Sequence, residues 1–166
     1  MPGSIISLGA SAFLFLAVAA QAGDLAPGLV PAAVRDAAQA RFADAKVIGA
    51  ALEKADDGKD IYEISLEDKN KTRLKATFTR EGALTLIETW IARKQLPEPV
   101  AKTLERKYPE ARYVRVKQVT EVVAKKEKLT SYEAVLVTPK KQIWGVDLAT
   151  DGKIIKTEKK ATENDD

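Results

Sequence analysis

Two Tyr-Glu pairs are the features of this chain that most suggest chemistry. Tyr62-Glu63 and Tyr132-Glu133 each lie in a segment whose apolar residues alternate with period two. A glutamate can act as a general acid or base when neighbouring groups shift its pKa. The alternation predicts instead that each tyrosine ring packs in the core and that each glutamate points to the outer, solvated face. We interpret both pairs as structural.

Three aspartates, Asp56, Asp57 and Asp60, could offer oxygen ligands to a calcium ion. Their spacing does not continue into an EF-hand loop, which places glycine at position six and glutamate at position twelve. The surrounding Asp-Asp-Gly-Lys sequence favours a solvated hairpin turn. We therefore predict no metal site here.

The chain has no Cys and no His. Disulfides, thiol nucleophiles, histidine-based triads and HExxH zinc sites are therefore excluded. After residue 22 the only serines are Ser65 and Ser131, and they are not part of a recognisable acid-base constellation. We expect a protein that is not an enzyme, with no catalytic residue, no cofactor and no metal.

Residues 1–22 read as a signal peptide, because they are uncharged, largely apolar and end in the small-residue pattern Ala20-Gln21-Ala22. No Lys or Arg precedes the apolar stretch, so a retained membrane anchor is the alternative. Cleavage after Ala22 would export the protein to the periplasm or the extracellular space. We expect no stable membrane insertion after cleavage.

The charge of the chain differs between its halves. Residues 23–95 hold 12 basic and 12 acidic side chains, whereas residues 96–166 hold 15 and 12. This basic excess is small and is interspersed with acids, whereas nucleic-acid binding favours a clustered basic stripe. We therefore expect no nucleic-acid partner.

An internal repeat organises the sequence. Residues in the first part of each repeat correspond at an offset of 66, and those in the second part at an offset of 70; examples are Pro31 with Pro97, Phe42 with Tyr108, Tyr62 with Tyr132, and Gly82 with Gly152. The change in offset falls where the first repeat has a short turn and the second has a charged segment, residues 121–128. We interpret that segment as a longer loop, because loops tolerate insertions.

Each repeat predicts one helix followed by four strands. Pro31 and Pro97 suit the first helical turn, and apolar residues at spacings of three and four follow them. The predicted fold class is α+β, with two tandem units that each pack one helix on a four-stranded antiparallel sheet. The predicted domains are residues 23–91 and 92–158, followed by a disordered charged tail at residues 159–166.

The two repeats resemble two tandem copies of the PepSY-like family, which is also described as similar to the β-lactamase-inhibitor protein, or BLIP-like, fold. Together the copies cover roughly residues 29–158, and the residues that carry the resemblance in the second, better copy are Leu96-Pro97, Tyr108-Pro109, Tyr132-Glu133 and Asp151-Gly152-Lys153. The first repeat departs from the pattern because no proline follows Phe42. The resemblance implies an exported domain without catalytic residues, in relatives proposed to bind or restrain hydrolases.

One face of the second repeat is the predicted partner-binding surface. If Val114 and Val116 face inward, the outward side chains include Tyr113, Arg115, Lys117, Glu133 and Asp147. The first hypothesis is a protein- or peptide-binding module, including an inhibitor or regulator of an exported peptidase or other hydrolase. The alternative is a structural or stress protein of the cell envelope that assembles with itself.

Overall fold

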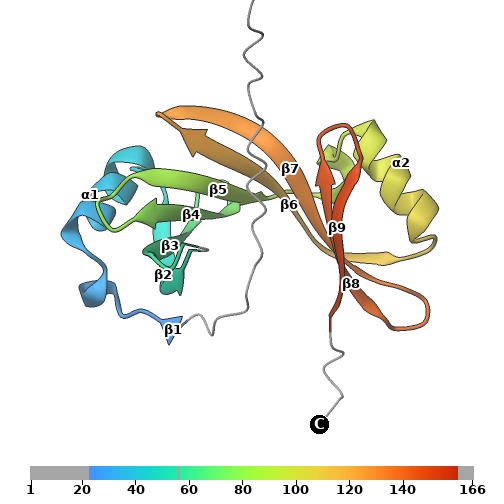
Figure 1. The fold of residues 1–166 in the computed structure, drawn as a ribbon, viewed down its shortest axis with the longest axis horizontal. Coiled ribbons are helices and arrows are strands. Elements are labelled where there is room, and N and C mark those ends of the chain that lie inside the picture. Colours follow the sequence, from blue (N-terminus) through green and yellow to red (C-terminus); the bar gives the residue numbers. More distant parts are fainter. Residues whose placement is uncertain (1–22, 56, 161–166) are drawn as a thin grey trace, which may run out of the picture.

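The computed structural model describes residues 23–55 and 57–160, and the predicted signal peptide lies outside them. These residues form one antiparallel sheet in which nine strands follow each other in sequence order (Figure 1). The strands are β1 Gly23–Asp24, β2 Lys46–Lys54, β3 Asp60–Glu67, β4 Arg73–Thr79, β5 Leu84–Trp90, β6 Arg112–Val123, β7 Lys126–Val137, β8 Ile143–Ala149 and β9 Ile154–Lys160. The helices are η1 Pro27–Leu29, α1 Ala32–Arg41, η2 Arg93–Gln95 and α2 Glu98–Lys107.

The predicted fold class, two tandem units each with its own four-stranded sheet, is wrong. Strand β5 pairs with β6 in antiparallel register, from Leu86 opposite Glu121 to Trp90 opposite Lys117, so the sheet is continuous between the two halves. Alternation identifies a strand and its two faces but does not name the strand that pairs with it. Two separate sheets would each leave an unpaired edge strand at this position. In the continuous sheet, β5 and β6 pair with each other instead.

The two ten-residue helices lie at opposite ends of the sheet (Figure 1). Each starts directly after a proline, Pro31 or Pro97, as the sequence predicts. Each also packs over its own apolar cluster: the α1 cluster includes Val34, and the α2 cluster includes Val100. The two halves therefore share one sheet while burying separate cores.

The strand register places both helices on the same face of the sheet. Tyr62 and Tyr132 are buried in the two clusters on that face, which confirms the predicted core position of both rings. The opposite face carries Glu63 and Glu133 and has no helix over it among the described residues. We call this second surface the open face.

The hairpin of β6 and β7 differs from the predicted loop at residues 121–128. Both strands are 12 residues long, and only Ala124 and Lys125 turn between them, with φ of 50° and 64°. Positive φ at both central residues suits a two-residue hairpin turn. The additional residues therefore lengthen the strands, and Glu127 near the tip pairs with Arg41 at the end of α1 at 2.6 Å.

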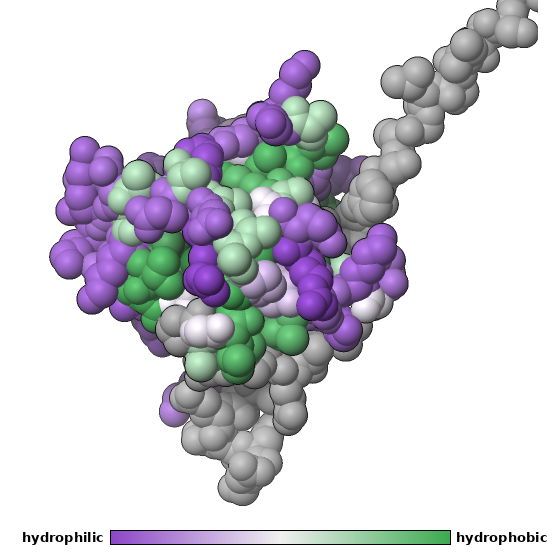
Figure 2. Space-filling view, turned by 90° about the vertical axis from the view of Figure 1, so that its left-hand side faces the viewer, coloured by the Kyte–Doolittle hydropathy of each residue, from purple (hydrophilic) through white to green (hydrophobic). Residues whose placement is uncertain are grey.

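Apolar and charged residues are interspersed on the side of the molecule that carries α1 (Figure 2). None of the helices in the described ranges is long and apolar enough to cross a membrane.

Strand β9 continues to Lys160, so the first two residues of the predicted tail, residues 159–166, belong to a strand. The rest of the tail lies outside the described residues.

Candidate functional site

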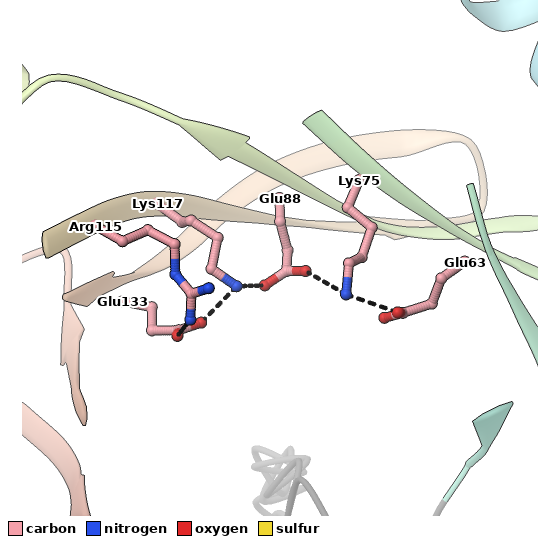
Figure 3. Close-up of polar contacts among 6 residues, drawn as sticks. All are labelled: Glu63, Lys75, Glu88, Arg115, Lys117 and Glu133. Atoms are coloured by element: carbon pink, nitrogen blue, oxygen red, sulfur yellow. Dashed lines mark hydrogen bonds and ion pairs between the residues drawn. The ribbon is translucent and has the colours of Figure 1, made fainter. Parts of the chain in front are cut away.

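A row of six charged side chains crosses the open face from β3 to β7 (Figure 3). The sign of the side-chain charge alternates from each strand to the next. In strand order, the row consists of Glu63, Lys75, Glu88, Lys117 with Arg115, and Glu133. We call this set the charged row.

Ion pairs connect the row from end to end. Lys75 Nζ lies 2.6 Å from Glu63 Oε2 and 4.0 Å from Glu88 Oε2. The ammonium of Lys117 is in direct contact with Glu88 Oε1 and lies 2.7 Å from Glu133 Oε2. Arg115 completes the row with a 3.2 Å contact to the other oxygen of Glu133. The Glu88–Lys117 contact joins β5 to β6, where the two halves of the sheet meet.

The centre of the row is buried although no helix covers it. Lys117 is 6% exposed, and its ammonium lies 5.3 Å from the centroid of the Trp90 ring. Val135 on the same face is also buried, beside Arg115 in the strand register. A buried lysine is costly unless it is paired, and here two carboxylates and an aromatic ring compensate its charge.

Neighbouring charges shift two carboxyl groups of the second half in opposite directions. Burial alone would raise the pKa of Glu133, but the charges of Lys117 and Arg115 outweigh it and lower that pKa. Asp147 lies directly opposite Glu133 on β8, and its pKa is raised by burial and by repulsion from Glu133. The row therefore favours the ionised form of Glu133 and disfavours the ionised form of Asp147.

The first half shows the same competition at the other end of the row. Burial raises the pKa of Glu63 despite its pairing with Lys75, and Glu53 on β2 adds to the increase. Burial would lower the pKa of Lys75, but Glu63 and Glu88 together raise it. Lys75 is therefore held firmly in its charged form between two glutamates.

Four of the five predicted partner-binding residues, Arg115, Lys117, Glu133 and Asp147, meet on the open face. The predicted orientation of Tyr113 is wrong: its side chain packs against the α2 cluster, and its ring lies 4.4 Å from the guanidinium carbon of Arg93. A bulge at Val114 causes the difference, since Tyr113 pairs with Leu136 and Arg115 pairs with Val135. One additional residue places Tyr113 and Arg115 on opposite faces.

Sequence reasoning missed Lys75, Glu88 and Trp90 as members of this site. It placed Glu63 and Glu133 on the outer face, which the register confirms, but interpreted them as solvated charges. The alternation of Leu74, Lys75 and Ala76 could have placed Lys75 beside Glu63. The position of Glu88 next to Lys117 required the β5–β6 pairing, which the pattern does not reveal.

The arrangement offers little to a small substrate. A carboxyl pair with oppositely shifted pKa values is the kind used in acid-base catalysis. However, the open hollow of about 310 Å³ lies between the end of α1 and the β3–β4 turn, lined by Arg41, Asp44 and Asp68, and not over Glu133. No group of three or more His, Cys, Asp or Glu suited to a metal occurs within residues 23–55 and 57–160. The side chains of the row mainly pair with each other.

Comparisons with known proteins identify the fold. No family model and no curated protein match this chain. Solved structures do: a putative periplasmic protein from Bacteroides eggerthii is 14% identical, with a TM-score of 0.63 over 78% of this chain and 88% of that one. A DUF2874 family protein from Bacteroides uniformis is 16% identical, with the same TM-score and the same coverage of both chains.

A third solved structure is a BLIP-like protein from Bacteroides fragilis. It is 13% identical, with a TM-score of 0.58 over 82% of this chain and 91% of that one. The fold is BLIP-like. This agrees with the fold part of the predicted resemblance, whereas membership of the PepSY-like family stays a prediction. Identities this low establish a shared fold and leave the function to be argued from the site.

Proposed function

We propose that this chain is an exported, non-catalytic module that binds a protein or peptide partner on its open face. The observation that carries the proposal is the charged row, in which Lys117 lies between Glu88 and Glu133. No helix within the described residues covers this row. Long charged side chains on a solvated sheet normally lose conformational entropy when a partner orders them. Here mutual pairing has already ordered them.

The composition of the open face suits a protein interface. Trp90 and Arg115 are of the residue types that most often anchor interfaces. Ser131, which lies opposite Val119 and Ala149, provides a small, partly exposed position beside the row. Both charge signs are present on this face, which disfavours a nucleic acid, whose phosphates require a predominantly basic surface.

The likeness to BLIP-like and periplasmic proteins supports the finer parts of this proposal. We infer export to the periplasm or the extracellular space, and a partner that is an exported peptidase or another hydrolase. The fold by itself does not determine function, so the partner class rests on the predicted PepSY-like resemblance. The activity that we propose is binding of this partner, without turnover of any substrate by the chain itself.

We further infer that residues 23–91 and 92–158 arose by duplication of one PepSY-like unit, although they now share one sheet. Matched features support this inference. Gly82 and Gly152 both have positive φ, of 83° and 86°, and both lie against the first turn of a helix. Bulges occur at the corresponding residues Ile48 and Val114.

Self-assembly is the alternative function, and the outer edge of β9 is the observation that favours it. Within the described residues β9 pairs only with β8, and Ile155 on it is exposed. An exposed strand edge can pair with another chain. Lys156, Lys159 and Lys160 on the same strand oppose such pairing, because edge lysines would be brought close together.

The test is affinity capture with the chain lacking residues 1–22 on exported proteins of the producing organism, combined with sedimentation of the purified protein. Recovery of one partner at fixed stoichiometry, with a monomeric purified chain, supports the binding module. Concentration-dependent oligomers without a captured partner would favour the self-assembling alternative. Turnover of a substrate by the purified chain would contradict a non-catalytic role.

A further inference from the structure

One end of the second half is covered by basic side chains. The elements that reach this end are the last turn of α2, the start of β6, the β7–β8 turn and the end of β9. Six exposed cations lie there, and we call them the basic end: Arg106, Lys107, Arg112, Lys140, Lys141 and Lys159. Lys160, next along β9, instead extends over Gly145 on the open face, where its charge acts on Glu133 and Asp147.

The strand register shows that these residues share one end of the sheet. Arg112 pairs with Val137, the last residue of β7, and Lys159 pairs with Trp144, the second residue of β8. The end of α2 lies at the same place, because the Tyr108 ring is 5.9 Å from the Trp144 ring. Lys140 and Lys141 form the tip of the turn between Val137 and Ile143.

The charge of the basic end is not balanced within the described part of the chain. None of its six cations forms an ion pair there. The acidic residues closest to them in sequence are Glu105, which pairs with Arg93, Glu110 and Glu158. Three further acids, Glu163, Asp165 and Asp166, follow in the sequence and reduce the net charge of the full chain.

The corresponding end of the first half also carries cations, but acids lie among them: the cations are Arg41, Lys46, Lys69, Lys71 and Arg73, and the acids are Asp44, Glu67 and Asp68. Arg41, which corresponds to Lys107, pairs with Glu127, and Lys71, which corresponds to Lys141, pairs with Glu67. Asp68 also lies in that turn, where its carboxylate accepts backbone hydrogen bonds. Two of the five cations at this end of the first half are therefore paired, whereas none of the six in the basic end is paired within the described residues.

We propose that the basic end holds the protein peripherally on the anionic surface of a lipid bilayer. Its cations are spread over one helix, one turn and two strand ends, and the hollow identified in the protein lies in the other half. Such a spread suits diffuse negative charge better than one buried anion. Clusters of four to eight cations bind anionic lipid, each residue contributing additional affinity.

The experiment is co-sedimentation of the purified chain lacking residues 1–22 with two kinds of vesicle. One contains phosphatidylcholine alone, and the other contains about one third phosphatidylglycerol, an anionic lipid. We expect binding to the anionic vesicles only, and release at high salt because surface charge is screened. Binding to both kinds of vesicle, or binding that salt does not weaken, would contradict the proposal.

A pair of matched variants locates the binding. The quadruple variant Arg106→Gln, Lys107→Gln, Lys140→Gln and Lys159→Gln should lose at least about tenfold in affinity for the anionic vesicles. The control variant Lys54→Gln, Lys59→Gln, Lys69→Gln and Lys126→Gln has the same net charge, and its changes lie outside the basic end. Equal losses in both variants would assign the effect to net charge and overturn the proposal. None of the eight changes touches the charged row, so partner binding is tested separately.

Discussion

The ammonium of Lys117 on β6 pairs with the carboxylate of Glu88 on β5, at the position where the two halves of the sheet meet. The pair has no counterpart in a protein with two separate sheets. It links the fold to the site, because the continuous sheet is what allows the charged row to extend from the first half into the second.

Removal of the Lys117 charge should destabilise the protein strongly. Lys117→Met removes the cation that lies between Glu88 and Glu133 and leaves them only the outer contacts with Lys75 and Arg115. Breaking such a partly buried pair costs up to about 3–5 kcal/mol of unfolding free energy. Chemical denaturation measures the change, and Lys128→Met at an exposed position of β7 is the control. Adding Glu88→Gln and Glu133→Gln to Lys117→Met should restore most of the loss. A loss below about 1 kcal/mol would place Lys117 in a solvated pair.

Asp147→Asn should stabilise the protein at neutral pH. The pKa of Asp147 is raised in the folded state, so its ionisation opposes folding at neutral pH, and this cost disappears as the pH falls below the unfolded-state pKa. We expect a gain of about 0.2–1 kcal/mol, the usual size of a cross-strand charge effect. Thermal unfolding at neutral and acidic pH, with Asp36→Asn on α1 as control, measures it. A gain of equal size at acidic pH would exclude the electrostatic explanation.

Gly152→Ala should cost more than Gly58→Ala, although both glycines have positive φ, of 86° and 79°. A Cβ at Gly152 would lie 2.4 Å from the carbonyl oxygen of Pro99, whereas a Cβ at Gly58 would meet nothing within 4 Å. The shared backbone strain is about 1–2 kcal/mol, and the contact with α2 adds about 1–3 kcal/mol to the cost for Gly152. Equal unfolding free energies for the two variants would show that the β8–β9 turn does not support α2.

The sequence predicts the local elements of this fold well, because their signals are local. Proline before each helix and the alternation around Tyr62 and Tyr132 identify the helices and the core face. Two features depend on pairing between strands and could not be predicted this way. The β5–β6 pairing brings Glu88 to Lys117, and the bulge at Val114 separates Tyr113 from Arg115.

The candidate site was predicted in part for the same reason. Arg115, Lys117, Glu133 and Asp147 come from three neighbouring strands of the second half, so alternation alone places them together. Glu63, Lys75 and Glu88 come from the first half, which the sequence treats as a separate unit. Their place in the row follows only from the continuous sheet.

The most direct test of the account is the affinity of the captured partner for a variant with a blocked open face. Ser131→Arg places a long side chain beside the charged row, and Gln39→Arg places the same side chain on the exposed side of α1 as a control. Isothermal titration with folded variants should show a loss of at least about tenfold for Ser131→Arg, which corresponds to about 1.4 kcal/mol. The control should bind like the unmodified chain. Unchanged affinity for Ser131→Arg would contradict partner binding on the open face.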